Sequence, residues 1–144
     1  MNAHIYIATD SAYAGQRERQ YGYVLECEYH GSIQTREGFG EMRGTYNQVI
    51  LTAMAEAMER FKRRCEIYVH TENTYILEMT ARNLAKWESE SFQTSSGKAL
   101  KNQNEWIRLW KAIKNQSVIG VPGKHEYSEW LKSEFDHRKT RQHQ

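Results

Sequence analysis

The stretch His4-Ile5-Tyr6-Ile7-Ala8-Thr9-Asp10 decides how the rest of the chain is interpreted, because it predicts a β-strand that runs straight into an acidic residue. Most of its residues are β-branched or aromatic types that favour strands. The segment 11–20 that follows is polar and contains Gly15, which is typical of a loop. We therefore expect the chain to begin with a strand that ends at a carboxylate.

Two further strands are expected directly after this loop. Residues 20–28 alternate with a period of two, which indicates a strand. Gly31-Ser32 predicts a turn, and residues 33–42 predict a third strand that Gly38 and Gly40 weaken. Short connections between successive strands favour antiparallel pairing, so the first half of the chain is predicted to be an antiparallel meander.

The strongest helix signal begins at Thr45, a suitable N-cap residue. Apolar residues recur every three or four positions after it and form a wide stripe. They are Val49, Ile50, Ala53, Met54, Ala57, Met58 and Phe61. We expect Lys62, Arg63 and Arg64 to occupy the last turn of this helix, where cations favour the helix dipole.

The second half of the chain predicts strands and helices in alternation. The expected elements are a strand over 65–71, a helix over 73–84, a loop over 88–97, a helix over 102–115, a strand over 117–121 and a helix over 127–135. This order predicts an α/β fold with a five-stranded mixed sheet, three antiparallel strands then two parallel, with helices packed on both faces. One domain is expected over residues 1–137, and a polar, disordered tail over 138–144.

Composition sets few limits on function. The net charge of +2 neither requires nor excludes nucleic acid as a partner. No apolar run approaches the roughly 18 residues of a membrane helix, so we expect no membrane association. Cys27 and Cys65 are too few for a disulfide framework and favour a reducing, cytoplasmic setting.

Four stretches stand at the corners of this predicted order of elements. They are Ile7–Ser11, Thr45–Leu51, Val69–Ile76, and a segment that runs from Ala85-Lys86-Trp87 through Gly97–Asn102 to Trp106 and Leu109. Together they resemble type 1 ribonuclease H. The last is the most specific, because an aromatic residue, a glycine, a Lys-Asn pair and a tryptophan follow in the family's order. The resemblance implies an RNase H-like domain whose partner is nucleic acid, either an RNA–DNA hybrid or a duplex.

The resemblance also implies a metal site, because the family uses carboxylates to hold divalent cations, Mg²⁺ or Mn²⁺, at the scissile phosphate. Asp10 matches the first carboxylate position. Glu72 matches the third, with a longer side chain than the usual Asp. The second position falls on Ile50, which cannot bind a metal ion. Glu56 does not replace it, because six residues turn the helix by about 240°.

The fourth carboxylate position depends on the alignment of the last helix. The most direct alignment places Lys132 there, and a shifted register offers Glu129 or Glu134. His125 matches the family's mobile histidine loop, where Gly123-Lys124 stands in place of a Gly-His pair. The candidate catalytic residues are Asp10, Glu72 and His125, and the candidate metal ligands are Asp10, Glu72 and Glu129.

Substrate contacts carried over from the family form a second group. The candidate substrate-binding residues are Ser11, Asn47, Thr74, Trp87, Lys98, Lys101 and Asn102. Asn47, Thr74 and Asn102 match positions that contact sugar or phosphate. Lys98 and Lys101 lie where the family grips the backbone of the hybrid.

Three hypotheses follow from these residues. The first is an RNase H-like protein that binds nucleic acid and has weak or no hydrolytic activity. The second is an active, metal-dependent ribonuclease H that uses Asp10, Glu72 and a displaced Glu129 or Glu134. The third is a fold reused as an interaction module, for which the sequence identifies no protein partner.

Overall fold

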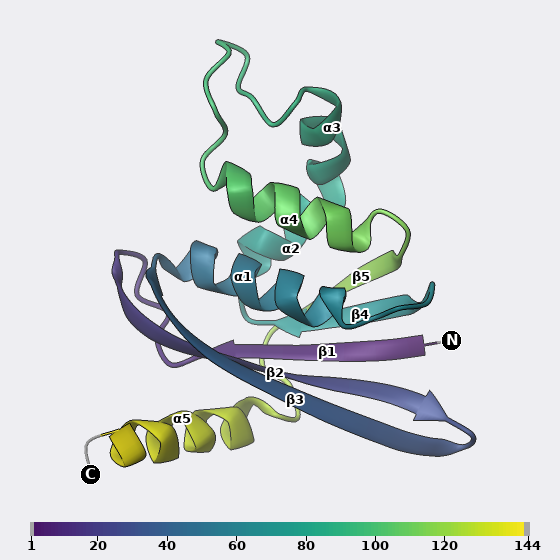
Figure 1. Ribbon diagram of the computed structural model, residues 1–144, viewed down its shortest axis with the longest axis vertical. Coiled ribbons are helices and arrows are strands. Elements are labelled where there is room, and N and C mark those ends of the chain that lie inside the picture. The colour runs from purple at the N-terminus through teal and green to yellow at the C-terminus, as the bar shows by residue number, and fades with distance from the viewer. Residues whose placement is uncertain (1, 143–144) are drawn as a thin grey trace.

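The computed structural model describes residues 2–142, and the side chains of residues 2–139. Its elements, shown in Figure 1, are β1 (Asn2–Thr9), β2 (Arg17–Tyr29), β3 (Ser32–Gly44), α1 (Tyr46–Glu59), β4 (Glu66–Thr71), α2 (Thr74–Arg82), α3 (Leu84–Ser89), α4 (Gln103–Ile113), β5 (Ser117–Pro122) and α5 (Ser128–Gln142). None of the helices within the described residues is long and apolar enough to cross a membrane.

The five strands form one mixed sheet in the order β3-β2-β1-β4-β5. The strand pairs β1–β2 and β2–β3 are antiparallel, and the pairs β1–β4 and β4–β5 are parallel. Helices α1 to α4 lie on one side of the sheet and α5 lies on the other (Figure 1). The predicted fold class is thereby confirmed. Because β1 and β4 are parallel neighbours, their carboxyl ends meet at one edge of the sheet.

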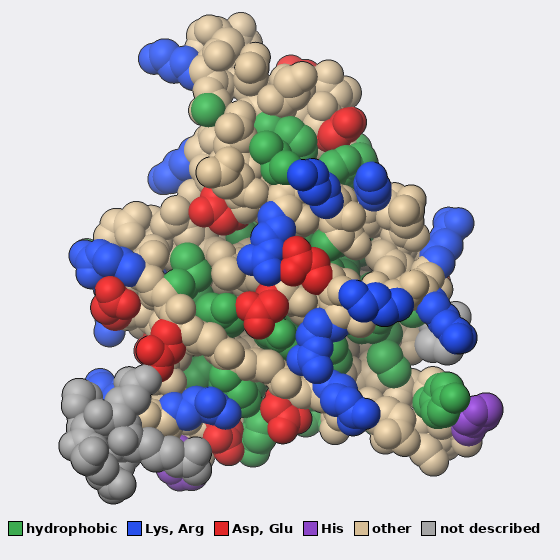
Figure 2. Space-filling view, viewed as in Figure 1, with side chains coloured by type: hydrophobic (Ala, Val, Ile, Leu, Met, Phe, Trp, Pro, Cys, Tyr) green, Lys and Arg blue, Asp and Glu red, His purple; other side chains and the backbone are tan. Residues whose placement is uncertain are grey.

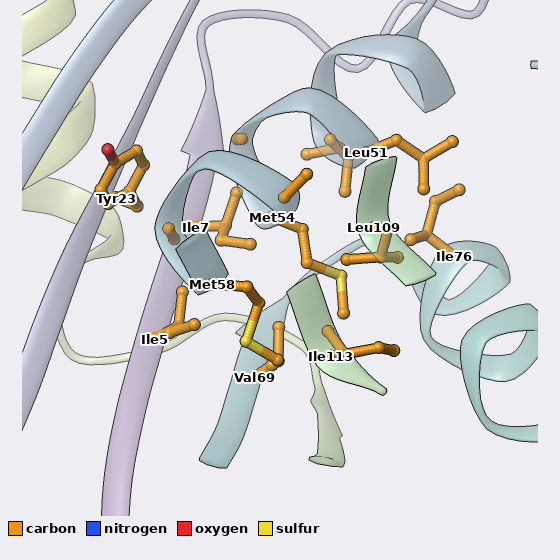
Figure 3. Close-up of a cluster of buried hydrophobic side chains, with 14 of the residues drawn as sticks. Ile5, Ile7, Tyr23, Leu51, Met54, Met58, Val69, Ile76, Leu109 and Ile113 are labelled. Atoms are coloured by element: carbon orange, nitrogen blue, oxygen red, sulfur yellow. The ribbon is translucent and has the colours of Figure 1, made fainter. Parts of the chain in front are cut away.

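The main core lies between the sheet and the helices α1, α2 and α4 (Figure 3). The predicted apolar stripe of α1 is buried, and Met54 and Met58 are fully inaccessible to solvent. They face Ile5 and Ile7 of β1 and Leu109 of α4 across this layer. Removal of this apolar surface from water is the main force that holds the helices to the sheet.

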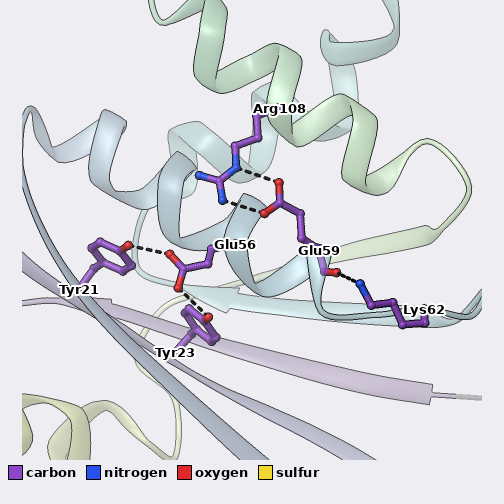
Figure 4. A network of polar contacts seen from close by, with 6 residues as sticks. All are labelled: Tyr21, Tyr23, Glu56, Glu59, Lys62 and Arg108. Atoms are coloured by element: carbon purple, nitrogen blue, oxygen red, sulfur yellow. Dashed lines mark hydrogen bonds and ion pairs between the residues drawn. The ribbon is translucent and has the colours of Figure 1, made fainter.

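The glycines of β3 do not weaken the strand, because two tyrosines occupy the space beside them. A Cβ atom on Gly38 would lie 2.4 Å from the Tyr23 ring, and one on Gly40 would lie 2.3 Å from the Tyr21 ring. The two hydroxyl groups donate hydrogen bonds to Glu56 of α1, at 2.6 Å from Tyr21 and 2.9 Å from Tyr23 (Figure 4). β3 therefore continues to Gly44 and is tied to α1.

The end of α1 differs from the prediction. The helix ends at Glu59 with Arg60 as its C-cap. Lys62, Arg63 and Arg64 follow the helix instead of forming its last turn, so their assignment to that turn was wrong.

Two further differences concern short or polar segments. A short helix, α3, begins at Leu84 and extends into the region predicted as a loop. Helix α5 continues to Gln142, so residues 138–142 are helical and do not form a disordered tail. The remaining residues of the predicted tail, 143–144, lie outside the described residues.

Candidate functional site

A pocket of about 200 Å³ opens where the carboxyl ends of β1 and β4 meet the first turns of α1 and α5. Five charged residues are part of its lining. They are Asp10, Glu72, Lys124, Glu129 and Lys132. Ile50, Ser11 and Thr71 also line it. The pocket therefore brings together residues from β1, α1, β4 and α5 or directly after them, the four places where the family resemblance implies carboxylates.

The strand ends place two of the carboxylates. Asp10 directly follows β1, and its backbone N–H donates to the carbonyl of Gln20 at 3.2 Å. Glu72 directly follows β4, the parallel neighbour of β1. Both side chains are exposed. Two carboxylates from neighbouring strand ends are thus available to solvent in one pocket.

Helix α1 contributes an apolar wall where the family resemblance calls for a carboxylate. The helix begins with a capping box in which Thr45 and Gln48 bond to each other's backbone N–H groups. This start places Ile50 beside the pocket, with 1% of its surface exposed. The Ile50 side chain offers no ligand atom for a cation.

Contacts between α5 and the sheet determine which of its side chains face the pocket. Leu131 and Phe135 are buried against Tyr6 and Val24. A Cβ atom on Gly22 would lie 3.1 Å from Leu131, so this glycine permits the close approach of α5. In the resulting orientation Glu129 and Lys132, which are one turn apart, both line the pocket, whereas Glu134 does not.

The loop beside Asp10 is held by a buried guanidinium that sequence reasoning missed. Arg19 is 2% exposed. Its nitrogens donate to the backbone carbonyls of Ser11, Tyr13, Gly15 and Gly44, with distances of 2.8 Å to Ser11, 2.6 Å to Gly15 and 2.8 Å to Gly44. Arg19 therefore joins the loop after β1 to the end of β3. The sequence carried no signal for it, because Arg19 occurs in a stretch of polar and charged residues.

His125, a candidate catalytic residue, is engaged on both ring nitrogens. Nδ1 accepts a hydrogen bond from the backbone N–H of Tyr127 at 3.2 Å. Nε2 lies 2.9 Å from the carbonyl of Ile7, so the neutral ring carries its proton on Nε2 and donates there. Burial lowers the pKa of His125, although the bond to the Ile7 carbonyl acts in the opposite direction. His125 does not line the pocket, and its catalytic role stays a prediction.

A pair of histidines, His4 and His70, lies on the face of the sheet that α1 to α4 leave uncovered. His4 Nδ1 and His70 Nε2 are 2.9 Å apart, and the Tyr6 ring stacks on His70 at 4.3 Å. Burial, followed by the nearby charges of His4 and His125, lowers the pKa of His70 to about 4. The rings of His4, Tyr6 and His70 form a polar aromatic layer next to the strand end that carries Glu72.

The predicted substrate-binding residues divide into two groups. Ser11 lines the pocket, and Asn47 accepts a hydrogen bond from the Asn73 amide at 2.9 Å near the start of α2. Thr74, the first residue of α2, is exposed.

The other group belongs to the segment around α3, which protrudes from the body of the molecule (Figure 1). Trp87 packs edge-on against the buried Trp106, with ring centres 4.9 Å apart. Lys98 and Lys101 are exposed, and Asn102 caps α4 in a left-handed conformation. The pocket and this protrusion are thus separate surfaces.

The pocket does not fit a pair of divalent cations. Within the part of the chain that the structure describes, no three His, Cys, Asp or Glu side chains are grouped closely enough to hold a metal ion. Asp10, Glu72 and Glu129 line one pocket without converging, and Lys124 and Lys132 add positive charge to it. A binuclear site needs several convergent carboxylate oxygens.

Comparison with known proteins gives consistent matches. The family model described as RNase H matches residues 2–123. A ribonuclease HI of Neisseria meningitidis serogroup B is 28% identical over 138 residues, which are 95% of this chain and 88% of that relative. The solved structure of LC9-RNase H1, a type 1 RNase H with the type 2 active-site motif, matches with a TM-score of 0.73 at 18% identity, over 94% of this chain and 69% of that one. A foamy viral protease-reverse transcriptase in complex with an RNA/DNA hybrid matches with a TM-score of 0.67 at 12% identity, over 92% of this chain and 19% of that one.

Proposed function

The chain belongs to the ribonuclease H family, and on this basis we propose that it binds RNA–DNA hybrids or related duplexes while its hydrolytic activity is weak or lost. One observation carries the proposal: the pocket that gathers Asp10 and Glu72 also contains Ile50 and Lys132. An apolar wall occupies the place where the family resemblance calls for the second carboxylate, and an ammonium group lies beside Glu129 in the region where it calls for the fourth.

The electrostatic consequence is large. Two unit charges roughly 4 Å apart interact by about 4 kcal/mol at an effective dielectric constant of ~20. Exchange of a carboxylate for the ammonium of Lys132 changes the local charge by two units, and Ile50 removes a further anion. When bound, divalent cations would activate water and stabilise the leaving oxygen. The described residues disfavour such binding, so we expect any Mg²⁺ or Mn²⁺ to be held weakly.

The binding half of the proposal rests on surfaces that remain. Lys98 and Lys101 are exposed on the protrusion and can approach a phosphate backbone. Polar side chains such as Asn47, Thr74 and Asn102 suit contacts with sugars and 2′-hydroxyl groups of an A-like duplex. The free cysteines Cys27 and Cys65 favour a cytoplasmic location for this function, which stays a prediction.

Binding of a labelled RNA–DNA hybrid of 24 base pairs tests the proposal, with titrations at several salt concentrations in EDTA and in Mg²⁺. We expect measurable binding that weakens as salt rises, because backbone contacts release counterions. The affinity should be similar in EDTA and in Mg²⁺. Absence of binding at low salt would contradict the proposal and favour an interaction module without nucleic acid.

Glu129 favours a second candidate function, an active ribonuclease H. It lines the pocket together with Asp10 and Glu72, so a third carboxylate is available there although the three do not converge as they stand. Incubation of the hybrid with the protein in Mg²⁺ and in Mn²⁺ separates the two candidates. Cleavage of the RNA strand that Asp10→Asn abolishes would establish this second function. Intact substrate at high protein concentration would exclude it.

A further inference from the structure

Positive charge is concentrated in two short segments of this chain. Residues 59–64 and 108–114 together contain seven Lys and Arg residues and one acidic residue, Glu59. The rest of the chain contains 13 Lys and Arg against 17 Asp and Glu. Although the net charge is only +2, the positive charges are therefore distributed very unevenly along the chain.

The fold brings these two segments onto one surface. Arg108 of α4 forms two hydrogen bonds with Glu59 of α1, at 2.8 and 2.7 Å (Figure 4). After α4, the Gln116 side chain accepts from the N–H of Cys65 at 2.7 Å and donates to the carbonyl of Arg63 at 2.9 Å. The carboxyl ends of α1 and α4 consequently lie side by side. Figure 2 shows Lys and Arg side chains gathered over this part of the molecule.

The basic patch is defined as the cations that follow α1 and those at the end of α4. They are Lys62, Arg63, Arg64, Lys111 and Lys114, and all five are exposed. Ion pairs among the described side chains are confined to Glu18–Arg43 and Glu59–Arg108, so none of the five has an acidic partner within 4.0 Å.

Stabilisation of helices accounts for only part of this arrangement. Lys111 lies in the last turn of α4, where a cation favours the helix dipole. Lys62 donates to the carbonyl of Glu59 at 3.2 Å and so also stabilises the end of α1 (Figure 4). Arg63 and Arg64 lie beyond the C-cap of α1, and the dipole effect falls off within the last turn. Arg63 and Arg64 have no acidic partner among the described side chains, and an anionic ligand would neutralise the repulsion between them and the neighbouring cations.

We propose that the basic patch binds the phosphate backbone of nucleic acid, at the opposite end of α1 from the pocket. This inference rests on the proposed function and adds a second contact surface to it. The 14 residues of α1 separate the two by about 20 Å. A duplex carries one negative charge per roughly 1.7 Å of its axis, so a hybrid longer than the pocket offers phosphates for such a surface.

The experiment compares salt dependence in two variants of equal net charge. The patch variant is Lys62→Gln with Arg63→Gln and Arg64→Gln, and the control is Arg36→Gln with Arg43→Gln and Lys139→Gln, which also removes three exposed cations. Binding of the 24-base-pair hybrid is measured between roughly 50 and 300 mM salt. Each lost phosphate contact should lower the slope of log K against log salt by ~0.9.

We expect the patch variant to lose about 2 to 3 units of slope and to bind at least ~10-fold more weakly at low salt, whereas the control keeps most of its slope. Equal slopes in the two variants would overturn the patch while leaving the proposed function intact, because the unmodified chain would still bind. Absence of binding by the unmodified chain would instead overturn the proposed function, and the patch with it. Thermal unfolding of both variants checks that the fold is retained.

Discussion

The two ends of α1 differ in how their charges are arranged. At its amino end, the pocket mixes three carboxylates and two ammonium groups, contributed by β-strand ends and by the α5 region. At its carboxyl end, the basic patch presents charges of one sign from two adjacent segments. Mixed charge disfavours a cluster of metal ions, and charge of one sign favours a polyanion.

This difference suggests that chemistry and binding depend on separate parts of the molecule. Ile50 and Lys132 change the pocket without touching the basic patch or the protrusion that carries Lys98 and Lys101. Under the proposed function, the pocket has lost features needed for hydrolysis while the basic patch and the protrusion remain available to a phosphate backbone. If this is correct, variants of the pocket should alter hydrolysis without altering the salt dependence of binding.

Repair of the pocket should produce the largest effect. Ile50→Glu combined with Lys132→Asp adds two carboxylates and removes a cation from the same pocket. These charge changes should strengthen cation binding by several kcal/mol. Where cation binding limits hydrolysis, each ~1.4 kcal/mol corresponds to a tenfold change in rate. We expect hydrolysis of the hybrid in Mn²⁺ to rise at least ~100-fold over the unmodified chain.

The matched control for repair is Ile50→Gln with Lys132→Asn, which has similar shape and no new charge. Addition of Asp10→Asn to the repaired chain should remove the gained activity. A repaired variant that folds normally, binds the hybrid and still cleaves nothing would show that the pocket fails for reasons other than its charge.

Loss of the Arg19 contacts should have the next largest effect, a decrease in the free energy of unfolding. The contacts that are lost all lie at the pocket end of the molecule. Arg19→Met leaves four backbone carbonyls without their donor, and a buried unsatisfied polar group typically costs 1 to 3 kcal/mol. We expect the free energy of unfolding to fall by about 3 kcal/mol, measured by denaturant titration.

Arg17→Met is the control for this change, since Arg17 is exposed and should alter stability by less than ~0.5 kcal/mol. If Arg19→Met and Arg17→Met proved equally stable, the loop after β1 would not depend on the buried guanidinium. The salt dependence conferred by the basic patch should be the same in both variants.

Features that depend on local patterns could be predicted from the sequence. The order of strands and helices along the chain followed from local periodicity, because residues 20–28 alternate and the stripe of α1 repeats every three or four residues. Asp10 and Glu72 were placed correctly at strand ends for the same reason. Helix α5 was predicted too short because residues 136–142 are polar and show little amphipathic pattern.

The rest depends on contacts between distant parts of the chain. The orientation of Glu129 and Lys132 is set by Leu131, which packs beside Gly22 more than a hundred positions earlier. The burial of Arg19 depends on the carbonyl of Gly44, 25 residues later. Local patterns carry no information about such contacts. The sequence alone therefore did not predict which side chains of α5 face the pocket or that Arg19 holds the loop after β1.

A smaller change in stability is expected with pH, because histidines lie next to the strand end that carries Glu72. The groups that face His70 are His4, Tyr6, His125 and, through its charge, Glu126. The pKa of His70 is about 4 in the folded chain, below the ordinary value of 6.5. Between these two values the unfolded chain binds a proton that the folded chain does not, so stability falls as pH is lowered through this window and is fully retained above it.

His70→Gln should therefore flatten the pH dependence of unfolding between about pH 6.5 and 4. Because the ring is only partly buried and water screens its charge, we expect the difference from the unmodified chain to be about 1 kcal/mol across the window. His137→Gln, at an exposed position on α5, is the matched control. If the His70→Gln chain loses as much stability on acidification as the control, the protonation of His70 does not contribute to the pH dependence of unfolding. The two ends of α1 would then differ in the arrangement of their charges and not in their response to pH.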